Sequence, residues 1–305
     1  MRVTRVLCFF LVISFVLFSQ WCEISYADDS LHIGHESLIE KYHKIEKELE
    51  KSSLTIPFYL ESSVSINASH VDIYGTIEYP FNIVGNELQF PTNWCGIVLP
   101  HSYVKACTYK KVNDTWLLIL YNVKQFQDPI KKAYQMNFEY HVIAQEPGFI
   151  SISLAAREGF FMTKDHQFGL EAIPLDQDRT FIHLRYSYRY SSLAYFLIKS
   201  YVSIFGGGRI GFSVIGTDSD GNPVYVSGLR GAIEGGVLRY YLTILAYMDT
   251  LKIPVDQRFE KRISQWYDLT ARYKRQLFEM EKEAYLTYKR QDQESQLILQ
   301  GALNR

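Results

Sequence analysis

The chain has 305 residues, of which 47% are hydrophobic and 21% are charged, and its formal net charge is −1. This composition excludes a disordered, collagen-like or small disulfide-stapled protein, because it offers ample apolar material for a buried core. Lysine and arginine do not gather on one stretch as a nucleic-acid groove requires, so no nucleic-acid partner is expected. The 23 tyrosines point instead to amphipathic pockets or interfaces, because tyrosine is apolar along its ring and polar at its tip.

Residues 1–27 have the pattern of a signal peptide. Arg2 and Arg5 precede an apolar run over 6–18, and Ser25-Tyr26-Ala27 offers small residues for cleavage. The alternative is a membrane anchor, but about 13 apolar residues are fewer than the roughly 20 that span a bilayer. The mature protein is therefore expected to be exported, to the periplasm or to the extracellular space.

Cleavage after Ala27 removes Cys8 and Cys22 and leaves Cys95 and Cys107 as the only two thiols. In an oxidising compartment two such cysteines are expected to form a disulfide, which would contribute about 3 kcal/mol. The alternative is a pair of buried free thiols. The sequence has no CxxC, no HExxH and no tight cluster of metal-ligating residues, so it indicates no metal site and no cofactor.

The first predicted elements are a helix and a series of strands. An amphipathic helix is expected over 37–51, within an N-terminal segment 28–53, because apolar residues recur there at spacings of 4, 3 and 4. Period-two alternation over 58–79 predicts a long strand or a hairpin, and one or two short helices follow within 80–103. Six further strands are predicted over 105–110, 115–123, 133–144, 149–157, 167–173 and 179–190. The short polar turns between these strands favour an antiparallel meander, because parallel strands need long crossovers.

The C-terminal part is predicted to be mainly helical. A helix over 192–205 is broken by glycines at 206–208, and two short extended stretches follow within 209–228. A long apolar-faced helix over 231–251 must lie against the sheet to bury its stripe. The remaining segment, 253–305, is a charged helical tail with an amphipathic pattern over 257–290. The tail is expected to pack on its own domain, the alternative being peripheral contact with a membrane or an envelope protein.

This order of elements resembles the START and SRPBCC (Bet v 1-like) superfamily, whose α+β helix-grip fold wraps a curved antiparallel sheet on a long C-terminal helix. The motifs are also similar to a family of uncharacterised exported bacterial proteins within it, through Asn93-Trp94-Cys95, Val104-Lys105-Ala106-Cys107, Leu170-Glu171-Ala172 and Gly228-Leu229-Arg230-Gly231. The resemblance runs from about residue 54 to 288 and implies a START-like domain over 54–252. Where that family has Glu-Arg-Asn, this chain has Glu234-Gly235-Gly236. The superfamily implies a tunnel between sheet and helix that holds a lipid or another apolar ligand, usually without catalysis.

Four tyrosines are candidates for lining such a tunnel. Tyr186 and Tyr188 share one face of a strand with Ile182 and Leu184. His183 and Arg185 fall on the other face of that strand, which is expected to face water. Tyr140 and Tyr240 lie on the apolar stripes of a neighbouring strand and of the long helix. The alternative is that all four are ordinary core residues with satisfied hydroxyls.

Two arginines are candidates for binding an anionic headgroup at the tunnel mouth. Arg230 and Arg239 are nine positions apart, which places them about 180° apart on a straight helix, so at most one can face the tunnel. Arg239 is favoured because its neighbours on the helix are small or apolar. Glu171 and Asp176 could in principle form a carboxylate pair for acid-base chemistry.

These patterns predict an exported protein that binds a lipid or another hydrophobic ligand without chemistry. One alternative is a cyclase- or hydrolase-like enzyme that uses the same cavity. The other is a non-catalytic structural or assembly protein of the cell envelope that acts through its helical tail.

Overall fold

The computed structural model describes residues 32–50, 56–205 and 208–305. The predicted signal peptide over 1–27 and the first two glycines of the predicted break, at 206–207, lie outside these residues.

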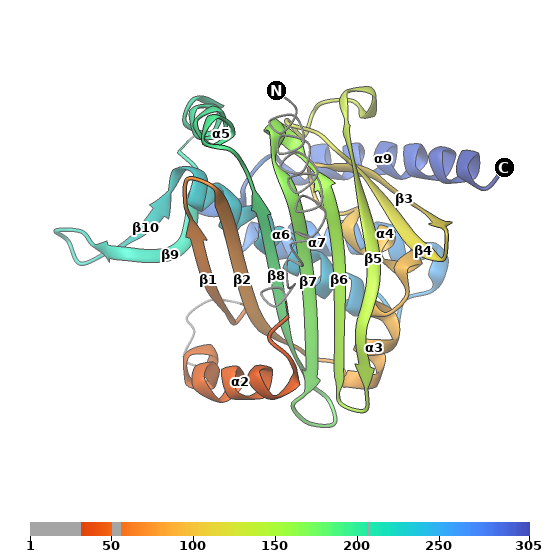
Figure 1. The fold of residues 1–305 in the computed structure, drawn as a ribbon, viewed down its shortest axis with the longest axis horizontal. Coiled ribbons are helices and arrows are strands. Elements are labelled where there is room, and N and C mark those ends of the chain that lie inside the picture. The colour runs from red at the N-terminus through yellow and green to blue at the C-terminus, as the bar shows by residue number, and fades with distance from the viewer. Residues whose placement is uncertain (1–31, 51–55, 206–207) are drawn as a thin grey trace, which may run out of the picture. The chain divides into compact units, whose positions relative to one another are not determined.

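One eight-stranded antiparallel sheet forms the body of the protein, in the order β1-β2-β8-β7-β6-β5-β4-β3 (Figure 1). The segment 58–79 is a hairpin, and the six other predicted strands are all present. The strands are β1 (Phe58–Val64), β2 (Ala68–Ile77), β3 (Val104–Val112), β4 (Thr115–Asn122), β5 (Tyr134–Glu146), β6 (Phe149–Glu158), β7 (Lys164–Pro174) and β8 (Thr180–Arg189). The last strand pairs with β2, which joins the hairpin to the meander. The predicted α+β class is confirmed.

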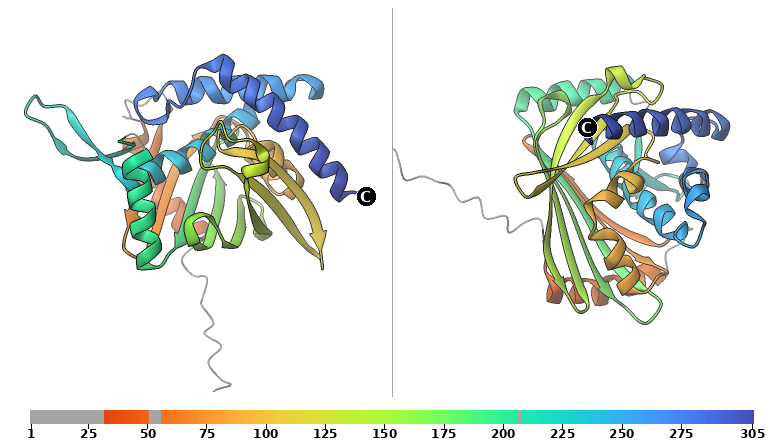
Figure 2. Two further views of the ribbon diagram at one scale, coloured as in Figure 1. Left: turned by 90° about the horizontal axis from the view of Figure 1, so that it is seen from above. Right: turned by 90° about the vertical axis from the view of Figure 1, so that its right-hand side faces the viewer.

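The long helix α6 (Gly228–Asp249) lies on one face of the sheet (Figure 2). The sheet meets it with aligned apolar residues: Leu184 of β8 pairs with Ile73 of β2 and Leu170 of β7, and all three are fully buried. At Gly75 a Cβ atom would stand 2.1 Å from the hydroxyl oxygen of Tyr241, so only glycine lets helix and sheet approach this closely here. This arrangement confirms the predicted helix-grip fold.

Two short helices, α3 (Phe81–Leu88) and α4 (Pro91–Val98), pack on the same face of the sheet. A disulfide joins Cys95 in α4 to Cys107 in β3, as predicted. Helix α5 (Ser192–Phe205) follows β8, and the small hairpin of β9 (Ile210–Thr217) and β10 (Pro223–Ser227) leads into α6.

The tail consists of α7 (Arg258–Ala271), α8 (Lys274–Leu277) and α9 (Lys282–Leu303), and it packs on its own domain. The indole of Trp266 donates to the backbone oxygen of Arg239 at 3.1 Å, and the hydroxyl of Tyr285 donates to that of Pro100 at 2.7 Å. Among the described helices none is both long and apolar enough to cross a membrane.

Helix α9 covers the edge strand β3 with glutamine side chains. The backbone N–H of Cys107 donates to Gln296 at 2.8 Å, and the N–H of Tyr109 donates to Gln300 at 2.9 Å. Gln300 also donates to the backbone oxygen of Tyr109 at 3.0 Å. Four helical residues advance about 6 Å, close to the advance of two strand residues, so glutamines four apart can serve alternate strand residues. The tail thereby satisfies an edge that would otherwise be open to another strand.

The opposite face of the sheet is covered by α2 (His35–Glu50), which buries Leu38, Ile45 and Leu49 against aromatic residues of the strands. The expectation that His183 and Arg185 face water is therefore wrong for His183, whose exposed fraction is 1%. A two-residue alternation shows that the two faces of a strand differ, but it does not reveal that a distant helix covers the second face.

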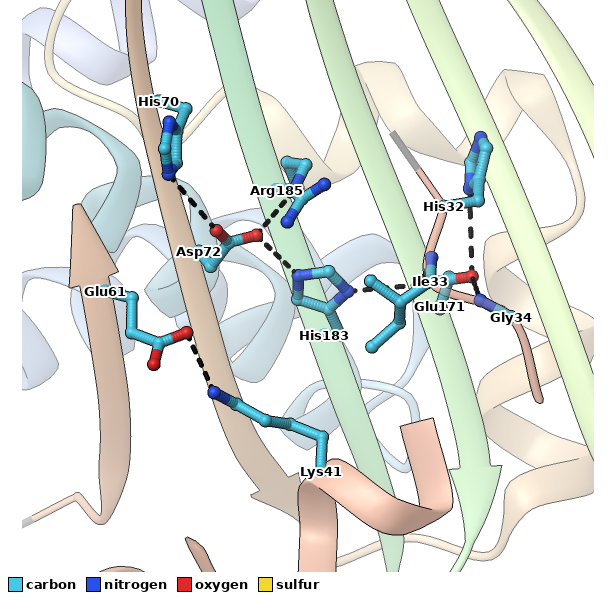
Figure 3. A network of polar contacts seen from close by, with 10 residues as sticks. All are labelled: His32, Ile33, Gly34, Lys41, Glu61, His70, Asp72, Glu171, His183 and Arg185. Carbon is cyan, nitrogen blue, oxygen red and sulfur yellow. Dashed lines mark hydrogen bonds and ion pairs between the residues drawn. The ribbon is translucent and has the colours of Figure 1, made fainter. Parts of the chain in front are cut away.

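A buried polar network lies under the N-terminal segment on this face (Figure 3). The two ring nitrogens of His183 lie within hydrogen-bond distance of carboxylate oxygens, Nε2 at 2.8 Å from Asp72 and Nδ1 at 3.1 Å from Glu171. Glu171 also accepts from the backbone N–H groups of Ile33 at 3.0 Å and Gly34 at 2.9 Å. Burial alone would raise the pKa of Asp72, but hydrogen bonds from His183 and from Arg185 outweigh it and lower the pKa to about 2. The network ties the segment before α2 to the sheet.

Candidate functional site

A cavity of about 340 Å³ lies between the sheet and α6. Helix α6 contributes one face of its surface, with Leu229, Ala232, Ile233, Gly236, Val237 and Tyr240 at the spacing of a single helical stripe. A Cβ atom on Gly236 would meet no heavy atom within 4 Å. The small size of Ala232 and Gly236 therefore keeps open a space that larger side chains would fill.

The sheet supplies an apolar wall. Alternate residues of β4 to β7 reach the cavity, among them Leu120, Phe138, Leu154 and Phe168. Of the described residues that line it, none is an aspartate, glutamate, lysine or arginine. An ionised ligand group placed inside would lack a countercharge and would cost several kcal/mol to bury. The cavity is therefore suited to an uncharged, largely apolar molecule.

Three polar side chains meet at one part of the cavity wall. The Nδ1 atom of His166 lies 2.7 Å from the hydroxyl oxygen of Tyr186, and its Nε2 atom lies 2.9 Å from the hydroxyl oxygen of Thr163. All three residues line the cavity. They come from β7, from β8 and from the loop that follows the short helix η2 (Phe160–Met162). This group was not predicted from the sequence.

Burial controls the protonation of this part of the wall. Because the charged imidazolium is poorly solvated there, the pKa of His166 falls from 6.5 to about 4. Burial also raises the pKa of Tyr186 well above its usual value. At neutral pH the pair therefore consists of a neutral imidazole and a neutral phenol.

Three of the four candidate tyrosines line the cavity, namely Tyr186, Tyr188 and Tyr240. The ring of Tyr240 stacks on His101, with centroids 4.3 Å apart. Tyr140 does not belong to the lining, which corrects the expectation for that residue. Its hydroxyl donates to the backbone oxygen of Leu88 at 2.9 Å, so it is a core residue with a satisfied polar end.

Neither candidate arginine lines the cavity, and both placements are corrected. Arg239 is 2% exposed and lies on another side of α6, where its Nη2 atom donates to Glu279 of the tail at 2.6 Å. Arg230 donates to the hydroxyl of Ser62 at 2.8 Å and forms an ion pair with Glu234 at 3.3 Å. The two arginines do lie in different surroundings, as the angular separation implied. Both guanidinium groups have carboxylate partners within the chain, so neither needs a ligand headgroup for charge balance.

Glu171 and Asp176 do not act together. Glu171 is buried in the network beneath the N-terminal segment, whereas Asp176 lies in the exposed turn before β8 and pairs with Arg179 at 2.7 Å. Within the described part of the chain, no group of three or more His, Cys, Asp and Glu residues is placed to hold a metal ion.

Comparisons with known proteins give likenesses of fold only. No family model matches the chain, and no curated protein matches it in sequence. Similar solved structures include truncated norcoclaurine synthase from Thalictrum flavum, at 9% identity and a TM-score of 0.34, covering 47% of this chain and 90% of that one. An aromatase/cyclase from Streptomyces sp. R1128 matches at 13% identity and a TM-score of 0.31, over 45% of this chain and 86% of that one. Human StAR-related lipid transfer protein 5 matches at 11% identity and a TM-score of 0.31, over 50% of this chain and 83% of that one.

These structures belong to the classes that the sequence resemblance named. At such low TM-scores they say nothing about the activity of this chain, which has to be argued from its own cavity.

Proposed function

We propose that the protein binds an apolar, uncharged small molecule in the cavity between the sheet and α6, without transforming it. The observation that carries this proposal is the lining itself. It is apolar, free of charged side chains among the described residues, and kept open on the helix side by Ala232 and Gly236. A cavity of this size in a packed interior is a ready-made ligand site.

A fluorescence titration with Nile red, a neutral dye that is bright only in apolar surroundings, tests the proposal. We expect saturable binding with one dye molecule per chain and a blue shift of the emission. Absence of saturable binding to the folded protein would overturn the proposal.

The pairing of His166 with Tyr186 favours a second candidate, acid-base catalysis in the same cavity. General bases and acids work best when their pKa values lie near the operating pH. With the pKa of His166 at about 4 and that of Tyr186 well above its usual value, the pair is a weak base and a weak acid at pH 7. The pair is therefore better suited to recognising a ligand than to moving its protons.

The third candidate, an envelope protein that acts through its tail, has less support. The tail buries Trp266, Tyr273 and Tyr285 in its own domain, so these residues of the amphipathic stripe already have a partner.

We further propose that the protein acts outside the cytoplasm, because residues 1–27 have the pattern of a signal peptide. N-terminal sequencing of the mature protein should begin at Asp28, and an intact Met1 terminus would contradict export by cleavage.

A further inference from the structure

The hydrogen bonds around His166 leave only one arrangement of protons. The hydroxyl of Thr163 donates to the backbone oxygen of Phe160 at 2.5 Å, so its single proton is already used. The Thr163 oxygen therefore meets the Nε2 atom of His166 as an acceptor, and Nε2 must carry the proton that joins them at 2.9 Å.

This arrangement fixes the direction of the next hydrogen bond. A neutral imidazole has one donor and one acceptor nitrogen, so Nδ1 of His166 is an acceptor. The hydroxyl of Tyr186, 2.7 Å away, must donate to it. The phenol proton is then no longer available to a ligand, and the Tyr186 oxygen can only accept a further hydrogen bond.

The surrounding backbone holds these side chains closely. A Cβ atom on Gly159 would stand 2.1 Å from Nε2 of His166, so the chain must have glycine there for the imidazole to fit. Just after Gly159, Phe161 and Met162 in η2 and Asp165 at the start of β7 adopt the left-handed region, with φ between 52° and 61°. Non-glycine residues rarely adopt this conformation, and such strain concentrates at functional sites. The ring of Tyr188 stacks on His166 with centroids 5.1 Å apart, which fixes the plane of the imidazole.

We propose that the cavity selects an uncharged apolar molecule with a hydroxyl group, or a similar hydrogen-bond donor, which donates to the oxygen of Tyr186. This inference rests on the proposed ligand binding and narrows its ligand class. Of the described lining residues none is cationic, so a carboxylate of the same chain length finds no countercharge. An ether of the same length offers no donor to Tyr186.

Displacement of Nile red by three matched ligands tests the proposal: dodecan-1-ol, 1-methoxydodecane and, at pH 8, dodecanoate. We expect the alcohol to displace the dye at about fivefold lower concentration than the ether, as one neutral hydrogen bond implies, and dodecanoate to be the weakest of the three. In Tyr186→Phe, whose own affinity for Nile red is measured first, the alcohol and the ether should displace the dye at equal concentrations. Tyr140→Phe is the matched control, because Tyr140 lies outside the lining, and it should keep the difference.

The outcomes separate the two proposals. Failure of the wild-type protein to bind Nile red overturns ligand binding itself. Nile red binding with equal displacement by alcohol and ether, or an unchanged difference in Tyr186→Phe, overturns the selectivity alone. A measurement that needs no variant is the ¹⁵N NMR spectrum of the His166 ring in the wild-type protein. At pH 7 it should show the tautomer with hydrogen on Nε2, and hydrogen on Nδ1 would contradict the assigned direction.

Discussion

The buried ion pair between α6 and the tail gives a stringent test of how the tail is held. Glu279, in the link between α8 and α9, receives hydrogen bonds from Arg239 at 2.6 Å, from Arg209 at 2.9 Å and from the hydroxyl of Tyr103 at 2.6 Å. The side chains of Arg239 and Glu279 are 3% and 7% exposed. Glu279→Gln preserves the shape of the side chain but removes the charge that balances a buried guanidinium.

We expect Glu279→Gln to lower the free energy of unfolding by about 3 to 5 kcal/mol, the usual result of leaving one buried ionic partner uncompensated. Adding Arg239→Met should restore much of this loss, because the unpaired charge is then removed as well. Arg209 is 30% exposed and can be solvated without its partner.

Urea unfolding followed by circular dichroism measures these differences. The matched control is Glu260→Gln, which breaks the pair between α7 and α9 formed by Glu260 and Arg290. Both of these side chains are about half exposed, so the loss should stay below about 1 kcal/mol. Equal losses for Glu279→Gln and Glu260→Gln would refute the argument that burial makes the Glu279 pair important.

Three further predictions concern stability. Between pH 6.5 and about 4 His166 is protonated in the unfolded chain but not in the folded chain, so the free energy of unfolding should fall as the pH falls. Urea titrations at pH 7 and 4.5 should show a smaller fall in His166→Gln than in the wild type, and an identical fall would contradict the lowered pKa of His166. Tyr241→Phe should leave the melting temperature unchanged or raise it, because the buried Tyr241 hydroxyl has no hydrogen-bond partner among the described residues; a clear decrease would reveal one. Replacing Cys95 and Cys107 with serine should lower the free energy of unfolding by about 3 kcal/mol in urea titrations, whereas no change would mean that the bridge is not formed.

The sequence is a good guide to the fold because the main signals are local. Alternation over each strand and the short turns between strands are enough to predict an antiparallel meander, and the apolar face of the long helix has to cover it. The same alternation correctly places Tyr186 and Tyr188 on the inner face of β8, because residues two apart share a face.

The parts that were missed depend on contacts between distant residues. His166 lies where the pairing of β7 with β8 shifts register between Lys164 and Gln167, so regular alternation does not indicate its direction. Arg239 meets Glu279 forty positions later, and helical spacing carries no information about that partner. Likewise, nothing within β8 shows that α2 packs on the face of the sheet to which His183 belongs.

Gly236→Phe tests ligand binding in the cavity most directly. A side chain at position 236 points into open space between α6 and the sheet, so phenylalanine should fill the cavity without displacing its neighbours. The matched control is Gly301→Phe on the exposed end of α9, which makes the same change far from the lining. We expect Gly236→Phe to abolish saturable Nile red binding while the melting temperature is kept or raised, and Gly301→Phe to bind as the wild type does. Wild-type dye affinity in folded Gly236→Phe would show that the ligand does not occupy this cavity.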